Sequence, residues 1–192
     1  MIRMVVIDVE TSGPYRVFNG IVPYHNLLEI GAVEVLLDFD KSKILRKFYA
    51  ILKPLSDRYD PKSIVHTSGK SLEYYKEKGE DPKAVMEKFY DFLYDIFEAN
   101  RRKVHFASDN PDFDAGWVRL YFDIFGIDIR GIIHHNSVSI KDLVRGFLRN
   151  FYISLYRLPG ELKVNLPHTH NALDDATRNA HVLINLAKFI NF

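Results

Sequence analysis

The order of strand-like and helix-like segments along this chain predicts an α/β domain with a mixed sheet. Strand-like segments come first, and amphipathic helices alternate with shorter strand-like runs after them. With 192 residues, of which 47% are hydrophobic and 27% charged, the chain suits one domain, residues 1–192, and can bury a core.

Three strands are expected before the first long helix. Met1–Val9 is a mostly apolar run, which is typical of a strand buried on both faces, and a Thr-Ser-Gly-Pro turn ends it. Glu29–Asp38 and Ile44–Lys53 form a predicted hairpin with its turn at Asp38–Ser42. Tyr15–Leu28 shows no clean period and is expected to be a loop.

Helices and short strands alternate in the rest of the chain. A long helix begins with Asp81 as the N-cap and Pro82 as its first residue. Its apolar residues recur at helical spacing, so one face belongs to the core. The other expected elements are a short helix at Ser71–Lys78, a strand at Lys103–Ala107, a helix from Pro111 to Gly126, a weak strand near Ile132-Ile133, and helices at Ile140–Phe151 and Asn171–Phe189.

Composition excludes several classes of function. The chain has no cysteine, which rules out disulfides, thiolate zinc sites and cysteine nucleophiles. It has neither a long apolar run nor a secretory N-terminus, so we expect no membrane contact and a cytoplasmic location inside the cell. A net charge of +1 gives no overall positive potential to attract nucleic acid. This favours binding of a few nucleotides at the end of a nucleic-acid strand over binding of long duplexes.

Acidic residues at the end of the first predicted strand are the first candidate site. Asp8 and Glu10 are two residues apart on a strand, so their side chains leave the same face. Two such carboxylates are unfavourable without a counter-charge, unless they are simply solvated beside a turn. If Asp114 and an aspartate of the last helix join them, the natural partner is a pair of divalent cations, which prefer oxygen ligands and support phosphodiester cleavage.

The last predicted helix offers two neighbouring aspartates and a preceding histidine. Asp175 lies beside a packing stripe of mostly small residues, but spacing alone does not choose between it and Asp174. His170 lies just before the helix, where capping or surface exposure is the alternative to a catalytic role. His168 shares its turn, which offers one obvious base.

Three segments, in order along the chain, form a set. Val6–Gly13 reads VIDVETSG, Asn110–Asp114 reads NPDFD, and His170–Ala176 reads HNALDDA. Together they resemble the sequence blocks of the DEDDh branch of the DEDD superfamily of 3′→5′ exonucleases. The likeness extends over nearly the whole chain, and its third block selects Asp175 over the neighbouring aspartate.

The resemblance implies a ribonuclease H-like fold, in which helices flank a central mixed five-stranded sheet. It implies hydrolysis at the 3′ end of single-stranded RNA or DNA, with RNA slightly favoured and nucleoside 5′-monophosphates released. Asp8 would bridge two Mg²⁺ or Mn²⁺ ions, Glu10 and Asp175 would complete one ion, and Asp114 would support the other. His170 would accept a proton from the attacking water, and a histidine near its ordinary pKa suits that work at neutral pH.

The same resemblance implies residues that contact the substrate. The turn with Thr11 and Ser12 would hold the terminal nucleotide, and Asn110 would shape the turn that presents Asp114 or would contact the substrate itself.

Two further surfaces carry basic and aromatic groups whose role the sequence leaves open. The Gly13–Leu28 loop is either a lid over the penultimate nucleotide or a surface loop packed against the domain; its relevant side chains are Tyr15, Arg16, Phe18, Tyr24 and His25. Lys141, Arg145 and Arg149 recur every four residues, as a ridge that either follows a phosphate backbone or is a solvated face.

Other functions fit parts of this pattern. The first is a proofreading exonuclease that works with a polymerase partner, and the second is a catalytically silent nucleic-acid-binding module. The presence of all five site residues argues against the silent module. A hydrolase of small phosphodiesters would use the same two-metal chemistry. The surplus of aromatic residues, 14% of the chain, leaves room for a homodimer interface.

Overall fold

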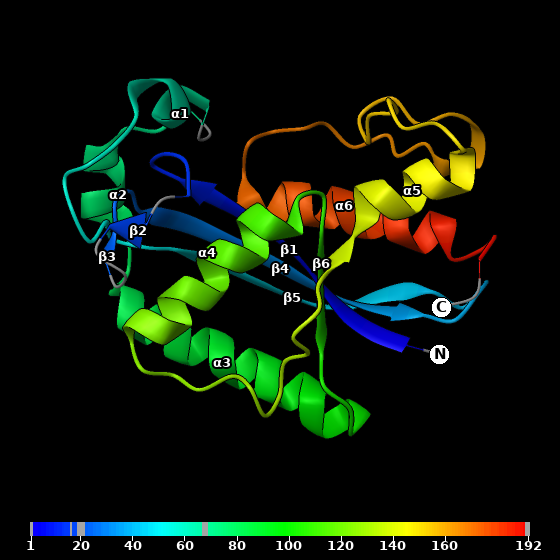
Figure 1. Cartoon of the computed structure of the whole chain (residues 1–192), viewed down its shortest axis with the longest axis horizontal. Coiled ribbons are helices and arrows are strands. Elements are labelled where there is room, and N and C mark those ends of the chain that lie inside the picture. The colour runs from blue at the N-terminus through cyan, green and yellow to red at the C-terminus, as the bar shows by residue number, and fades with distance from the viewer. Residues whose placement is uncertain (1, 16, 19–21, 67–68, 191–192) are drawn as a thin grey trace.

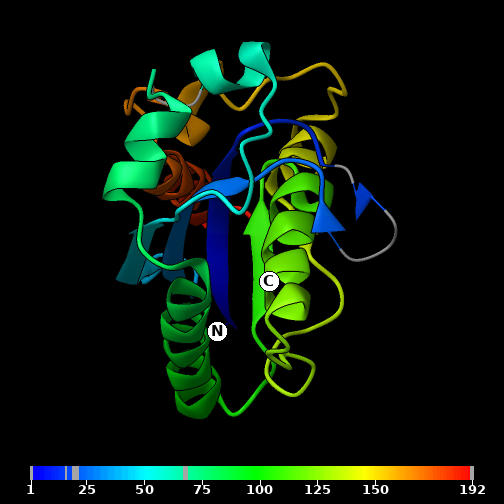
Figure 2. The ribbon, with the colours of Figure 1, turned by 90° about the vertical axis from the view of Figure 1, so that its left-hand side faces the viewer.

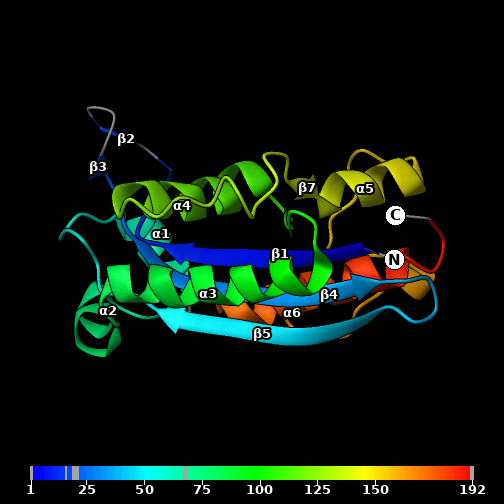
Figure 3. The same cartoon turned by 90° about the horizontal axis from the view of Figure 1, so that it is seen from below.

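A five-stranded mixed sheet forms the centre of the computed structural model, which describes residues 2–15, 17–18, 22–66 and 69–190. β1 pairs antiparallel with β4 and parallel with β6; β4 also pairs antiparallel with β5, and β6 pairs parallel with β7. Figure 3 shows β4 between β1 and β5. The strands are β1 (Ile2–Thr11), β4 (Leu27–Leu37), β5 (Lys43–Ile51), β6 (His105–Ser108) and β7 (Val138–Ser139). The predicted mixed sheet is confirmed.

Helices cover both faces of this sheet (Figure 1). α3 (Pro82–Asn100) and α4 (Pro111–Ile124) share one hydrophobic cluster with the sheet, and α5 (Ile140–Leu148) and α6 (Ala172–Leu186) share the other. Figure 2 shows α4 and α6 on opposite sides of β1. Among the described residues, no helix combines the length and the apolar character that crossing a membrane requires.

β1 is buried on both faces, as its apolar run predicts. Its odd-numbered residues Val5, Ile7 and Val9 belong to the cluster with α3 and α4, whereas Met4 and Val6 belong to the cluster with α6. Side chains alternate along a strand, so the residues that follow Val6 at even positions continue the row that faces α6.

Local capping signals place the helix starts. The Asp81 carboxylate accepts a hydrogen bond from the N–H of Ala84 at 2.9 Å, with Pro82 as the first helical residue. The Ser71 hydroxyl caps α2 (Leu72–Lys78), and the Asn171 side chain caps α6. These helix starts were predicted from the sequence. A short helix, α1 (Pro61–His66), and a 3₁₀ turn, η1 (Gly160–Leu162), complete the helical elements.

Two predicted elements differ from the structure. The fifth strand is β7, not the apolar pair Ile132-Ile133, where Ile133 forms only an isolated bridge with Val104. Both isoleucines are buried in the core cluster under α3 and α4, so their apolar character reflects packing and not strand formation. α5 ends at Leu148, before the predicted Phe151, because the next residue adopts a left-handed conformation with φ of 52°.

The segment predicted as a loop over residues 15–28 contains a small second sheet. β2 (Val17–Phe18) pairs antiparallel with β3 (Val22–Pro23), and β4 already begins at Leu27. Two-residue strands are too short to show a period in the sequence. Arg16, which the sequence placed in this loop, lies outside the described residues.

Candidate active site

Carboxylates from distant parts of the chain meet near the end of β1. Asp8 and Glu10 belong to β1, and Asp175 lies in the first turn of α6. One carboxylate oxygen of each lies within 4.8 Å of the other two. The predicted common face of Asp8 and Glu10 is therefore the face that α6 covers. Asp114, in the first turn of α4, is buried, and α4 lies on the other side of β1 from α6 (Figure 2). Its charge is the largest of those that raise the pKa of Asp8.

Burial and mutual repulsion make this cluster costly as a set of bare anions. Burial, followed by the charges of Asp114, Glu10 and Asp175, raises the pKa of Asp8 well above its ordinary value. Burial and neighbouring carboxylates raise the pKa of Glu10 to about 9. Burial also raises the pKa of Asp114 to about 7, although polar contacts with Ser108 and with the backbone of Val9 favour its carboxylate.

This donor set fits a hard divalent cation. Close carboxylate oxygens are the ligands that Mg²⁺ and Mn²⁺ prefer, and a cation would relieve the repulsion that raises these pKa values. Asp8, Glu10 and Asp175 are the residues that could share one ion.

The turn before α4 presents Asp114. The Asn110 carbonyl accepts hydrogen bonds from the N–H groups of Phe113 and Asp114, both at 3.0 Å, whereas its side chain makes no capping bond. The adjacent Asp109, which sequence reasoning missed, pairs with Lys141 Nζ at 2.9 Å. Its charge also raises the pKa values of Asp8 and Asp114. Its position directly after β6, at the same sheet end as the other acids, was the available signal.

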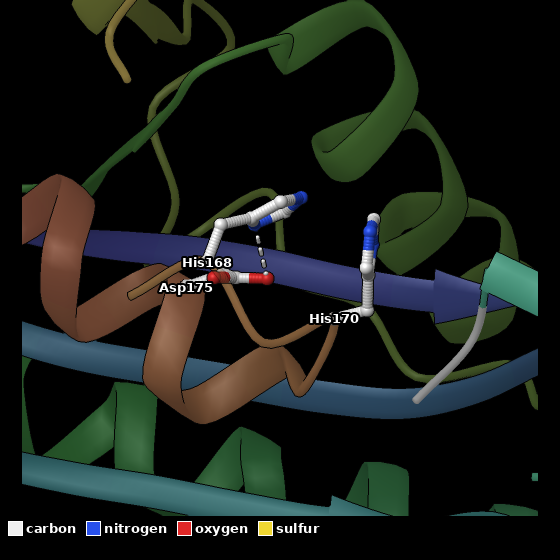
Figure 4. Close-up of side chains that lie close together, drawn as sticks. All are labelled: His168, His170 and Asp175. Atoms are coloured by element: carbon white, nitrogen blue, oxygen red, sulfur yellow. Dashed lines mark ion pairs between the residues drawn. The ribbon is translucent and has the colours of Figure 1, made fainter. Parts of the chain in front are cut away.

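Two histidines, not one, lie beside Asp175. The Nδ1 atom of His168 is 2.9 Å from Oδ2 of Asp175, and the His168 and His170 rings have centroids 4.0 Å apart. Figure 4 shows the Asp175 carboxylate directed at His168, with the His170 ring standing to one side. One ligand atom from each of the three residues lies within 4.8 Å of the others. His170 has a positive φ of 55°, which the turn into α6 imposes.

A buried glutamate that sequence reasoning missed ties this region together. Glu29 on β4 is fully buried and forms an ion pair with Lys70 at 2.6 Å. Its carboxylate accepts hydrogen bonds from Tyr75 at 2.7 Å and Tyr49 at 3.0 Å. It also contacts Asn171 Nδ2 and the N–H of Ala172, both at 3.4 Å, at the start of α6. Its charge is the largest of those that raise the pKa of Glu10.

A pocket of about 340 Å³ adjoins the carboxylates on the side of α1. Glu10, Thr11 and Phe113 line it, together with Val9, Gly13, Pro14, Asp60 and Ser63. The Thr11 hydroxyl donates to the Gly13 carbonyl at 2.8 Å.

Ser12 behaves differently from Thr11. Its hydroxyl is fully buried, donates to the Arg58 carbonyl at 2.9 Å and accepts from the backbone N–H of Asn26 at 2.8 Å. The structure therefore argues against the predicted substrate contact for Ser12, because this side chain holds the turn in place.

Three aromatic side chains of the Gly13–Leu28 loop, those of Tyr15, Tyr24 and His25, contact other residues of the protein. Tyr15 meets Trp117 edge-on, with centroids 5.5 Å apart, and His25 is buried with Nδ1 3.0 Å from the Pro14 carbonyl oxygen. Arg58 lies 4.9 Å from the Tyr24 ring centroid. Of the two interpretations, the packed surface loop describes these side chains.

The chain as a whole matches one protein family. The family model RNase_T, described as Exonuclease, matches residues 5–183. The chain therefore belongs to this exonuclease family, and it is a nuclease of the DEDD superfamily with the ribonuclease H-like fold and DEDDh type predicted from its sequence. No curated protein sequence matches it.

Solved structures of nucleases share this fold at low sequence identity. The nuclease domain of 3′hExo, a DEDDh family member, bound to rAMP, is 14% identical, with a TM-score of 0.65 over 95% of this chain and 90% of that chain. A 3′-exonuclease recognising the histone mRNA stem-loop is 13% identical, with a TM-score of 0.71 over 97% of this chain and 63% of that one. E. coli exonuclease I with a dA16 oligonucleotide is 17% identical, with a TM-score of 0.68 over 95% of this chain and 40% of that one. This chain thus spans less than two thirds of the latter two.

Proposed function

We propose that this nuclease is a metal-dependent 3′→5′ exonuclease that shortens single-stranded nucleic acid and releases nucleoside 5′-monophosphates. The observation that carries the proposal is the convergence of Asp8, Glu10 and Asp175 within 4.8 Å, beside a pocket that could receive one nucleoside. The buried Asp114 is close enough for its charge to act on Asp8. We assign the activity to one domain, residues 1–192.

Four carboxylates would hold two Mg²⁺ or Mn²⁺ ions. Asp8, Glu10 and Asp175 would be the ligands of one, and Asp8 and Asp114 those of the other. When bound, such ions lower the pKa of water and neutralise charge on the attacking and leaving oxygens. The protein's part is to hold these carboxylates in place, which α6 and the hydrogen bonds of Glu29 to the start of α6 support.

The two histidines divide the remaining work. His168 uses Nδ1 to hold Asp175, so we assign to His170 the removal of the proton from the attacking water, onto a nitrogen of its imidazole. A hydrogen-bonding partner on the carboxylate of a metal ligand orients that ligand. We therefore assign to His168 the positioning of Asp175.

The terminal nucleoside would occupy the pocket beside Thr11 and Phe113. Phe113 offers an aromatic ring for base stacking, and the backbone of the turn offers polar groups for the sugar. Because the 3′hExo nuclease domain, matched over most of its length, binds rAMP, we rank RNA slightly ahead of DNA.

Digestion of matched 5′-labelled single-stranded RNA and DNA with Mg²⁺ or Mn²⁺ tests this proposal. We expect a ladder that shortens from the 3′ end and is absent with Asp8→Asn. Cleavage inside the strand, or equal activity of Asp8→Asn, would contradict it. Binding to both polymers without cleavage of either would favour the catalytically silent nucleic-acid-binding module or a proofreading exonuclease that needs its polymerase partner. Cleavage of only a small phosphodiester would favour the small-substrate hydrolase.

A further inference from the structure

A surface next to the carboxylates is not used by the proposed chemistry. It consists of α5 and the segment that follows it, residues 140–160. Figure 1 shows α5 at the upper right of the view and α1 at the upper left. The pocket for the terminal nucleoside lies on the α1 side, since Asp60 and Ser63 line it. A strand whose last nucleoside fills that pocket and whose scissile phosphate lies at the carboxylates must leave towards the other side.

Two contacts join this surface directly to the site. Tyr156 packs on His168, with ring centroids 4.6 Å apart, and Lys141 pairs with Asp109 at 2.9 Å. Burial and the charges of Asp109, Asp175 and Asp8 raise the pKa of Tyr156 to about 12, which places its phenol beside the acidic cluster.

Aromatic side chains continue outward from Tyr156. Tyr152 is 92% exposed and Phe151 is 71% exposed, although both are large and apolar enough to be buried elsewhere in the fold. Between Tyr152 and Tyr156 lies a pocket of about 470 Å³, which Asn150, Ile153, Ser154 and Arg157 also line. Exposed rings beside a hollow of this size suit planar ligands such as nucleobases.

The charge of this surface suits a polyanion. Residues 140–160 contain four basic residues and one acidic residue, Asp142. Arg145 pairs with Asp142 at 3.2 Å and also lies 4.7 Å from the Phe151 ring centroid. Among the described residues, Arg149 and Arg157 are exposed and form no ion pair with a carboxylate, so both are available for phosphates.

We propose that residues 140–160 form a track for single-stranded nucleic acid, on which bases upstream of the scissile bond stack on Tyr156, Tyr152 and Phe151. The occupant is the same single strand that the proposed function cleaves, so this inference rests on that function. Arg149 and Arg157 bind its phosphates. Stacking does not read the edges of the bases, so the track binds strands of different sequence. It strengthens the binding of long strands relative to short ones.

Binding to oligonucleotides of graded length tests the track. In an Asp8→Asn background, which prevents cleavage, we expect Phe151→Ala with Tyr152→Ala to weaken binding of a strand of about ten nucleotides by about 5- to 100-fold. Tyr152→Trp, which keeps a stacking surface, should bind like the parent. The matched control is Tyr94→Ala on α3, an exposed tyrosine on a helix of the other sheet face, which should have no effect.

Salt dependence tests the cationic part separately. Arg149→Ala with Arg157→Ala should reduce the slope of log affinity against log salt by about 1.4, since each single-strand phosphate contact contributes about 0.7. Arg101→Ala with Arg102→Ala, beyond the end of α3, should leave the slope unchanged. An unchanged slope in the α5-side variant would overturn the phosphate contacts.

Catalytic measurements separate failure of the track from failure of the nuclease. With otherwise active protein, the aromatic double variant should lower the ratio of kcat/KM for the long strand to that for a dinucleotide by about 5- to 100-fold. An unchanged ratio would overturn the track. If the parent is a dimer in solution and the variant is a monomer, the track is also overturned, and this surface is an interface between two copies of the chain. If the parent cleaves neither substrate, the proposed function fails, while the binding assay still decides the track.

Discussion

Gly31 in β4 lies against the first residue of α6, Ala172. A Cβ atom on Gly31 would stand 2.1 Å from the Ala172 carbonyl oxygen and 2.4 Å from the N–H nitrogen of Leu173, so only glycine permits this approach. Gly31 is also the strand partner of Asp8. The contact therefore sets the distance between the helix that carries Asp175 and the strand that carries Asp8.

Gly31→Ala should disrupt this arrangement. The added methyl meets backbone atoms that cannot rotate away, so we expect a loss of about 1–3 kcal/mol or more in unfolding free energy, together with a fall in activity. Gly146→Ala on α5 is the control, because its Cβ would meet open space and alanine favours a helix by up to about 1 kcal/mol. Denaturant unfolding and cleavage rates check both, and a Gly31→Ala protein as stable and active as its parent would refute the idea.

Asp8→Asn should abolish cleavage and stabilise the metal-free protein. Removal of one charge from the buried cluster relieves repulsion that now raises the pKa values of its neighbours. Asp112→Asn, which changes an exposed aspartate in the first turn of α4, is the matched control and should alter neither property. Cleavage assays and thermal unfolding with a chelator give the two readouts. Full activity in Asp8→Asn would exclude the metal assignment.

Metal-free stability should fall as pH rises. Glu10 has its pKa raised from an ordinary 4.5 to about 9, so the folded protein holds this proton more tightly than the unfolded chain. The stabilisation is complete below pH 4.5 and is lost progressively towards pH 9, at up to about 1.4 kcal/mol per pH unit for one proton. Mg²⁺ should restore stability at the alkaline end and release protons. Unfolding curves with and without a chelator measure this effect, and metal-free stability that rises with pH would contradict it.

His170→Ala and His168→Ala should fail in different ways. We expect His170→Ala to lower kcat by about 10²- to 10⁴-fold with little change in metal affinity, as loss of a general base does. His168→Ala should instead weaken Mn²⁺ binding by about 10- to 100-fold, because Asp175 loses the partner that orients it. Titration calorimetry with Mn²⁺ alongside kinetics separates the two. The reverse pattern would make His170 a ligand and His168 the base.

Glu29→Gln should lower both the stability of the protein and the pKa of Glu10. The substitution leaves Lys70 without its partner and should cost on the order of 3 kcal/mol of stability, as for other broken buried pairs. It also removes the largest neighbouring charge that raises the pKa of Glu10, so metal binding should extend to lower pH. Glu34→Gln is the matched control, because Glu34 is also buried, pairs with Arg46, and lies further along β4 from the site. It should reduce stability without moving the pH dependence of metal binding.

Much of this protein follows from its sequence. The apolar run in β1, the Asp81 and Pro82 start of α3 and the small-residue stripe of α6 each report a local backbone period or a cap, which neighbouring residues determine. Alternation along the strand put Asp8 and Glu10 on one face. The motif resemblance, not a local pattern, identified Asp175 and Asp114 as their companions.

Only the tertiary structure decided which groups share the site. The pairing of Asp175 with His168, the contacts of the buried Glu29 with residues of α2, β5 and α6, and the choice of β7 over Ile133 as the edge of the sheet all depend on contacts between segments far apart in the chain. A periodicity cannot report such contacts, because each exists only after the chain has folded; the contacts of α6 further require that Gly31 allow its close approach to β4.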